Sequence, residues 1–249
     1  MSRFEGRRAL VTGGASGIGH ATTSLLKEMG ADVVLLDHDA EAARRTAEDL
    51  GVHAITADVR RAEEVETAVA DASRALGGRA DILVNAAGIY RFRSALEIDV
   101  AEWDDVFDTN LRGSWLVARA VARGLVDVGQ PGTIVNISST AGLVADRVEP
   151  ALHYNASKAG VIALTRQLAV ELAPYGIRVN AVCPGLIDTP MLRIMDDPVI
   201  GLRYLDEMVP LRRLGRPEEV AALIAFLSSD EAGYVTGVAV PIDGGVTLT

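Results

Sequence analysis

The sequence predicts a single α/β domain with a doubly wound parallel sheet of about seven strands and helices on both faces. Short apolar runs alternate with longer segments of helical periodicity along the 249 residues, and this order is typical of parallel strands joined by right-handed crossovers. The expected central strands are continuous apolar runs, as in a sheet covered on both faces. No repeat or Pro/Ser-rich linker divides the chain, so we expect one domain over residues 1–249.

The first part of the chain shows this alternation clearly. Ala9–Val11 is a short apolar strand, and a glycine-rich turn leads from it into a helix that reaches about Gly30. Ala31–Leu36 is rich in Val and Leu, which indicates a second strand. The segment Ala40–Leu50 is rich in Ala, Arg and Glu and predicts a helix, and Val52–Ala57 is the third expected strand.

The alternation continues to the end of the chain. A helical pattern runs from Arg61 to Leu76, and Ile82–Val84 is the fourth expected strand. One long helix is expected at about Ala101–Val126. The elements expected after it are a strand at Thr133–Ile137, a helix at Tyr154–Leu172, a strand at Ile177–Val182, a helix at Pro217–Leu227 and a strand at Gly237–Ile242.

The segment Leu186–Gly215 interrupts this order. It mixes Pro190, Pro198 and Pro210 with Met and Leu residues and has poor periodicity. A long segment of this kind inside a compact domain is often functional. Because it follows the sixth strand, we expect it to overhang the carboxyl edge of the sheet, where such folds bind ligands, as a substrate lid at about residues 186–215. The alternative is a short helical excursion on the surface.

Composition and charge exclude several classes of protein. The formal net charge is −10 and no basic run is present, so the chain lacks the positive patch that binds nucleic acid or anionic membrane. Cys183 is the only cysteine and the four histidines are scattered, so we predict no disulfide and no metal site. No apolar run approaches the ~18 residues of a membrane span, and the N-terminus offers no signal-peptide stretch. We therefore expect a cytoplasmic protein.

The turn after the first strand indicates a dinucleotide site. It reads Thr12-Gly13-Gly14-Ala15-Ser16-Gly17-Ile18-Gly19, and it closes a strand and opens a helix. Glycines at these positions allow a tight turn and let the backbone approach a pyrophosphate, which then meets the free N–H groups of the helix start. This context makes a Rossmann-type nucleotide site the prediction rather than a purely structural turn.

Residues at the ends of the next strands predict the rest of this site. Asp37 ends the second strand, where its carboxylate can accept both hydroxyl groups of the NAD ribose and would repel a 2′-phosphate. His38 follows rather than an arginine, which favours NAD over NADP. Asp58-Val59 and Asn85-Ala86-Ala87-Gly88 come after the third and fourth strands, on the same sheet edge, and could flank the adenine and its ribose.

A catalytic centre is predicted on the same edge. Tyr154 and Lys158 share one face at the start of a helix. A free tyrosine has a pKa near ~10, and a neighbouring lysine cation would stabilise the phenolate, so that the pair could exchange a proton with an alcohol or a carbonyl. Ser138 and Ser139 end the fifth strand, where a hydroxyl could bind the reacting oxygen. Asn110 lies within a predicted helix, where it could hold a water near Lys158.

Together these motifs resemble the short-chain dehydrogenase/reductase family in its compact single-domain form. The similarity extends over nearly the whole chain through Thr12-Gly13-x3-Gly17-x-Gly19, Asp58, Asn85-Ala86-Ala87-Gly88, Asn110, Ser139, Tyr154-x3-Lys158, Pro184-Gly185 and Ile242-Asp243-Gly244-Gly245. The resemblance implies that Ser139, rather than Ser138, orients the substrate oxygen, and that Tyr154 is the general acid/base. It implies that Lys158 lowers the pKa of Tyr154 and holds the nicotinamide ribose, while Asn110 completes a proton relay.

The resemblance also implies which residues meet the cofactor and suggests a homotetramer. Pro184, Gly185, Ile187 and Thr189 would contact the nicotinamide end. The full predicted NAD site is Gly13, Ser16, Gly17, Ile18, Gly19, Asp37, Asp58, Val59, Asn85, Ala86, Gly88, Tyr154, Lys158, Pro184, Gly185, Ile187 and Thr189.

For several other residues, a structural role explains the sequence as well as a functional role does. Arg91, Arg93, Arg147 and His153 could contact substrate, although solvated loop positions or a helix face turned elsewhere explain them as well. Trp103 and Trp115 have apolar helical spacing and are expected in packing or at a subunit interface. Cys183 is expected to be buried and inert.

The leading hypothesis is an enzyme that transfers a hydride between NAD(H) and a secondary alcohol or ketone. The pocket is expected between residues 140–153 and the predicted lid, whose Met and Leu content suggests a partly apolar substrate. Alternatives are a non-catalytic NAD-sensing protein on the same fold and an NADPH-dependent 3-oxoacyl-thioester reductase. A dehydratase or epimerase would need a separate substrate domain, which this length does not supply.

Overall fold

The computed structural model describes residues 3–145, 150–192 and 194–248. Within these residues the core is one sheet of seven parallel strands, in the order β3-β2-β1-β4-β5-β6-β7. The reversal of order after β1 creates the switch point at which doubly wound sheets bind ligands. The strands are β1 Arg8–Thr12, β2 Asp32–Asp37, β3 His53–Thr56, β4 Ile82–Asn85, β5 Gly132–Ile137, β6 Ile177–Pro184 and β7 Ala239–Ile242.

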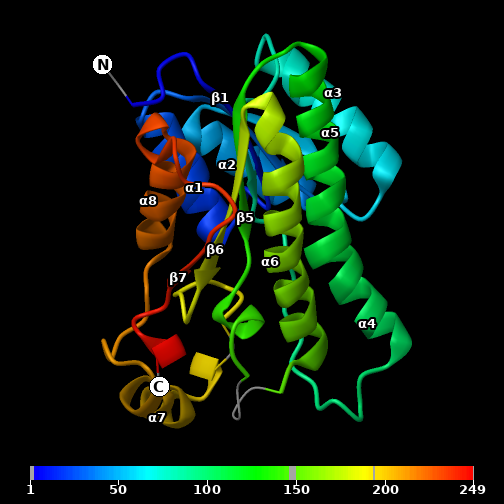
Figure 1. Cartoon of the computed structure of the whole chain (residues 1–249). Helices are drawn as coiled ribbons and strands as arrows, with labels where there is room; N and C mark the ends of the chain where they lie inside the picture. Colours follow the sequence, from blue (N-terminus) through cyan, green and yellow to red (C-terminus); the bar gives the residue numbers. More distant parts are fainter. Residues whose placement is uncertain (1–2, 146–149, 193, 249) are drawn as a thin grey trace.

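Helices cover both faces of this sheet (Figure 1). The α-helices are α1 Gly17–Glu28, α2 Ala40–Leu50, α3 Ala62–Ala75, α4 Val100–Phe107, α5 Gly113–Asp127, α6 Leu152–Leu172, α7 Pro198–Met208 and α8 Pro217–Ser228. On one face, buried side chains of α3 and α5 pack against residues such as Leu10, Leu83 and Ile134. On the other, α1 and α8 pack against the alternate residues Val11 and Val84. Each central strand is therefore buried on both sides, as its apolar sequence predicts.

The structure confirms the predicted fold class, and the boundaries of most elements differ by only a few residues. The long helix predicted at Ala101–Val126 is wrong in one respect, because its α-helical hydrogen bonding is broken. Asp108–Arg112 forms a π-helix, η1, between α4 and α5. Such a bulge inserts an extra residue into the turn and is frequent at functional sites. It directs the fully buried Asn110 towards the segment after β4.

The segment Leu186–Gly215 leaves the end of β6 and returns beside its own start. Ile187 and Gly215 form an isolated parallel bridge, and the Gly215 N–H donates to Leu186 O over 2.9 Å. The segment contains a short 3₁₀ helix, Ile194–Asp196, and the helix α7, so the helical alternative is right in part; α7 also lines the cavity described below, through Tyr204 and Met208. A small apolar cluster joins it to Val246, which lies close to the end of the chain. Figure 1 shows α7 and the C-terminus together at one end of the molecule.

Among the described residues, no helix has both the length and the apolar character needed to cross a bilayer.

Candidate active site

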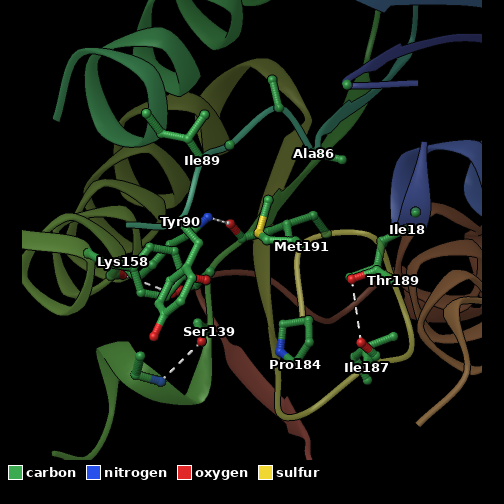
Figure 2. A pocket seen from close by; sticks show the side chains of 18 of the residues that line it. Ile18, Ala86, Ile89, Tyr90, Ser139, Lys158, Pro184, Ile187, Thr189 and Met191 are labelled. Atoms are coloured by element: carbon green, nitrogen blue, oxygen red, sulfur yellow. Dashed lines mark hydrogen bonds between the residues drawn. The ribbon is translucent and has the colours of Figure 1, made fainter. Parts of the chain in front are cut away.

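A large cavity of about 970 Å³ lies at the carboxyl ends of the strands. It is lined by the turns after β1, β2, β3 and β4, by the start of α6, and by the Leu186–Gly215 segment. All predicted site residues except Asn85 and Asn110 line it. In the view of Figure 2, Lys158 and Ser139 lie on one side and Ile187 and Thr189 on the other.

The glycine turn after β1 has the close packing that a nucleotide site requires. Gly13 has φ +62°, and a Cβ there would lie 2.8 Å from the Ala87 backbone. A Cβ at Gly19 would lie 2.0 Å from Gly13 O. The turn therefore tolerates no side chain at these positions. Ser16, the N-cap of α1, makes no side-chain capping bond, so N–H groups of the first turn are available to an anion in the cavity.

Asp37 lies at the carboxyl end of β2, beside the glycine turn. Its residue surface is 7% exposed, and it lines the cavity. Oδ2 accepts a hydrogen bond of 3.1 Å from the Ala15 N–H, so the carboxylate is anchored to the glycine turn. Oδ1 accepts one of 3.1 Å from the Asp39 N–H. Asp37 thus ends β2, as the sequence predicted, and its part in ribose binding stays a prediction.

Asp58 lies at the same end of the cavity, together with Val59. The side-chain hydrogen bond from Arg60 is the main reason that the pKa of Asp58 lies below its usual value. Arg60 also reaches Asp105 of α4, with Nη1 2.5 Å from Oδ1. Asp105 in turn lies 3.6 Å from Nη2 of Arg91, another residue of the cavity. The predicted adenine region is thus part of a network of charged side chains.

Asn85 does not line the cavity, contrary to its predicted place in the cofactor site. Its Nδ2 donates to Asn136 Oδ1 over 2.9 Å and to Ser114 O over 3.1 Å, in the buried interior. As the last residue of β4, it directs its side chain towards β5 and α5. Thr12, which was not assigned a role from the sequence, bonds the two turns together: its Oγ1 accepts from the N–H groups of Ala86 and Ala87, both over 3.1 Å.

Lys158 and Tyr154 project from the first turns of α6 into the cavity. Lys158 is 5% exposed, and its Nζ donates to Ile137 O over 2.9 Å. Nζ lies 5.6 Å from the centroid of the Tyr154 ring. Burial lowers the pKa of Lys158 to about 8, so the side chain is still mostly an ammonium ion at neutral pH. This cation lies close enough to the Tyr154 ring for a cation–π contact.

The two serines after β5 have different surroundings. Ser138 is 2% exposed, and its Oγ donates to Lys158 O over 2.8 Å. Ser139 is half-buried and lines the cavity, and its Oγ accepts from the Ala141 N–H over 3.1 Å (Figure 2). The Ser139 hydroxyl can still donate a hydrogen bond to a ligand, whereas the Ser138 hydroxyl already donates one to the backbone of α6. This difference supports the choice of Ser139.

Asn110 lies behind the cavity and connects the segment after β4 to the start of α6. Its Oδ1 accepts from the Ile89 N–H over 2.8 Å, and its Nδ2 donates to Ile89 O over 3.0 Å. Nδ2 also lies 3.1 Å from Ser157 Oγ, which donates to Tyr154 O over 2.8 Å. The side chain is therefore not directed at the cavity. Its predicted part in a proton relay remains a prediction.

Residues with no role assigned from the sequence complete the cavity. Tyr90 packs edge-on against Tyr154, with ring centroids 4.9 Å apart. Val246 reaches the cavity from the C-terminal segment. In the same segment, the Asp243 carboxylate accepts hydrogen bonds from the N–H groups of Gly245 and Thr247. Burial alone would raise the pKa of Asp243, but these hydrogen bonds have the larger combined effect and lower it. The Asp-Gly-Gly motif was the signal for this turn, but its position beside the site depends on tertiary packing.

Of the competing candidates, Arg91 lines the cavity, and the others that the structure describes lie outside it. His153 is fully buried and contacts Glu102, and Arg93 also pairs with Glu102, so neither lines the cavity. Arg147 lies outside the described residues. Cys183 is buried in β6, and burial raises its pKa. The remaining candidates are Trp103, which stacks on Phe107, and Trp115, which is 39% exposed and lies under Arg119.

This sheet, with a glycine turn, an anchored carboxylate and a Tyr/Lys/Ser centre on one edge, defines the class of dinucleotide-binding α/β oxidoreductases. A family model described as enoyl-(acyl carrier protein) reductase matches residues 13–247. The chain belongs to the short-chain dehydrogenase/reductase family.

Relatives across the family match nearly the whole chain. It is 42% identical to galactitol 2-dehydrogenase (L-tagatose-forming) of Cereibacter sphaeroides, with 99% of this chain and 97% of the relative covered. It is 38% identical to (3R)-3-hydroxyacyl-CoA dehydrogenase of Homo sapiens, with coverage of 100% and 98%. The crystal structure of gox2181 superposes with a TM-score of 0.95 at 39% identity, covering 99% of this chain and 98% of that one.

Proposed function

We propose that the protein is an NAD-dependent dehydrogenase that interconverts a secondary alcohol and a ketone, with Tyr154 as the general acid/base. One observation carries this proposal: a single cavity holds the Asp37 carboxylate and the Tyr154, Lys158 and Ser139 side chains. The first suits the ribose of NAD, and the others suit proton exchange with an alcohol.

The cradle of the cavity fits a dinucleotide. The bare glycine turn and the uncapped start of α1 would hold the pyrophosphate. Asp37 would accept the ribose hydroxyls, and its fixed charge would repel the 2′-phosphate of NADP, which supports NAD as the cofactor. Pro184, Gly185, Ile187 and Thr189 would hold the nicotinamide end. When bound, the nicotinamide supplies the acceptor or donor of a hydride.

The protein's own residues would then manage the proton. Ser139 would donate a hydrogen bond to the reacting oxygen, which places the alcohol at the Tyr154 hydroxyl. Tyr154 would take the alcohol proton during oxidation and return it during reduction. The Lys158 ammonium would favour the phenolate form of Tyr154 by electrostatic attraction. Because Lys158 is also hydrogen-bonded to Ile137 O, its charge is held in place before substrate arrives.

The substrate end of the cavity suits a partly apolar alcohol. Its side chains include Val144, Met191, Leu192, Met208 and Val246. Two relatives carry names that describe dehydrogenation of a polyol and of a hydroxyacyl thioester. The apolar lining favours a substrate with few hydroxyl groups besides the reacting one, because each additional buried hydroxyl would need a partner.

The test is nicotinamide absorbance with purified protein, using NAD and NADP against a panel of apolar secondary alcohols, polyols and hydroxyacyl thioesters. We expect NAD reduction with an apolar alcohol, and a loss of at least about 100-fold in kcat for Tyr154→Phe, with NADH binding retained. NADPH-dependent reduction of 3-oxoacyl thioesters would favour the reductase alternative. Tight NAD binding without turnover of any alcohol or ketone would favour a sensor.

A further inference from the structure

The first turn of α6 has no capping side chain of its own. Its N-cap is Ala151, which makes no side-chain hydrogen bond, and the turn contains no acidic residue. The N–H groups at such an end depend on tertiary contacts to hold them in place. Tyr154 lies in this turn, so the position of its hydroxyl depends on groups outside α6.

Three side chains connect this turn to α4 through the His153 side chain, and we call them the α4 clamp: Arg93, Glu102 and His153. Nε of Arg93 donates to both carboxylate oxygens of Glu102 over 2.9 Å. Nε2 of His153 lies 3.1 Å from Oε1 of the same carboxylate. His153 is fully buried and precedes Tyr154 directly, whereas Glu102 belongs to α4.

Backbone contacts also join the Arg93 segment directly to the residues that precede α6. The Arg93 N–H donates to Pro150 O over 2.9 Å, and Arg93 forms an isolated bridge with Ala151. The segment after β4, helix α4 and the start of α6 thus meet at one carboxylate. Glu102 also places a negative charge near the positive end of the α6 dipole, which stabilises that end. The Glu102 side chain is 15% exposed and that of His153 is fully buried, so solvent screens the contact between them weakly.

We propose that the α4 clamp positions the general acid/base: Glu102, through His153, holds the first turn of α6 and so fixes the Tyr154 hydroxyl relative to Ser139. This inference rests on the proposed function. None of the three clamp residues lines the cavity, so they act on the reaction through Tyr154 and not through substrate. A small displacement of a reacting group is costly, since a shift of about 1 Å can reduce a rate about 100-fold.

The imidazole chemistry indicates which substitution should preserve the clamp. Nδ1 of His153 is buried and has no hydrogen-bond partner within the described residues. A proton on Nε2 satisfies Glu102, whereas a proton on Nδ1 would be a buried, unpaired donor. A glutamine amide can place an N–H near the position of Nε2. His153→Gln should therefore retain the contact with Glu102, and His153→Leu should remove it while keeping an apolar side chain of similar size.

The test compares three variants with the wild type at saturating NAD and alcohol. We expect kcat to fall about tenfold or more in His153→Leu and in Glu102→Ala, and to stay within about threefold of wild type in His153→Gln. The solvent deuterium isotope effect on kcat should rise in the two impaired variants, because proton transfer to Tyr154 becomes slower. A general loss of stability would not move the isotope effect.

Glu66→Ala is the matched control. Glu66 pairs with Arg119 over 3.0 Å between α3 and α5 and does not line the cavity. It should leave kcat and the isotope effect unchanged. Wild-type kcat in His153→Leu, or an unchanged isotope effect in a slowed and folded variant, would overturn the positioning role. If the wild type itself turns over no alcohol, the proposed function fails first, and that outcome is distinct from the others.

Discussion

The Nζ of Lys158 lies 5.6 Å from the centroid of the Tyr154 ring and donates a hydrogen bond to the last residue of β5. The helix thus contributes both groups, and the sheet holds the cation by a backbone carbonyl. Such an arrangement has an energetic cost, because burial destabilises the ammonium ion. No carboxylate is among the groups that shift the pKa of Lys158.

Replacing this cation should stabilise the cofactor-free protein while it removes activity. The pKa of Lys158 falls from 10.5 to about 8 on burial, which corresponds to a cost of about 3 kcal/mol for the charged form. Loss of the bond to Ile137 O returns about 1 kcal/mol of that. Lys158→Met should therefore raise the free energy of unfolding at pH 7 by about 2 kcal/mol, measured by urea denaturation.

The pH dependence of this difference has a defined sign. Below pH 8 both the folded and the unfolded wild type carry the proton on Lys158, and the cost of burying the charge is fully present. As the pH rises from about 8 towards 10.5, the folded state releases the proton first, so the wild type gains stability. The advantage of Lys158→Met should shrink over this window. A constant difference from pH 7 to 10.5 would contradict the lowered pKa.

The two serines after β5 should separate stability from catalysis. Ser138→Ala leaves the buried Lys158 O without this donor, and we expect a loss of about 1 kcal/mol in stability. Ser139→Ala should change stability little and lower kcat, because it removes the expected hydrogen bond to the reacting oxygen. Thermal unfolding and steady-state kinetics on both variants check the pair. Equal kinetic losses with unchanged stability would contradict the assignment.

Asp37 should decide the choice of cofactor. The double variant Asp37→Ser/His38→Arg replaces the carboxylate by a neutral hydroxyl and introduces a cation at the next residue. We expect the ratio of kcat/KM for NAD to that for NADP to fall about 100-fold or more, since a repulsive charge is lost and an attractive one is gained. Kinetics with both cofactors provide the measurement. Asp49→Ser is a control, because Asp49 lies in α2 and does not line the cavity.

Gly19 should not tolerate a methyl group. A Cβ there would lie 2.0 Å from Gly13 O, which is backbone and cannot move without distorting the turn. We expect Gly19→Ala to weaken NADH binding about tenfold or more and to cost about 1–3 kcal/mol in stability. NADH fluorescence titration measures the first effect. At Gly124 in α5, a Cβ would meet only the flexible Arg79 side chain at 3.3 Å, so Gly124→Ala should bind NADH normally.

The strands of the sheet and most residues of the candidate site can be predicted from the sequence. Apolar runs such as Ile82–Asn85 and Gly132–Ile137 indicate strands because both faces of a central parallel strand must be buried. The glycine turn, Asp37, Ser139 and the Tyr154/Lys158 pair each follow or open a predicted element. Since the carboxyl ends of parallel strands share one edge, the order of elements alone brings these residues together.

Other features were decided only by tertiary structure. The π-helix at Asp108–Arg112 has no local signature, because it is held by the bonds between Asn110 and Ile89, which are distant in sequence. Asn85 follows the right strand yet is directed into the interior, where Asn136 and Ser114 offer partners. The α4 clamp joins residues 93, 102 and 153, whose contact depends on how α4 packs against α6. Periodicity and turn chemistry are local and can be read along the chain, whereas the partners of a buried polar group are set by packing.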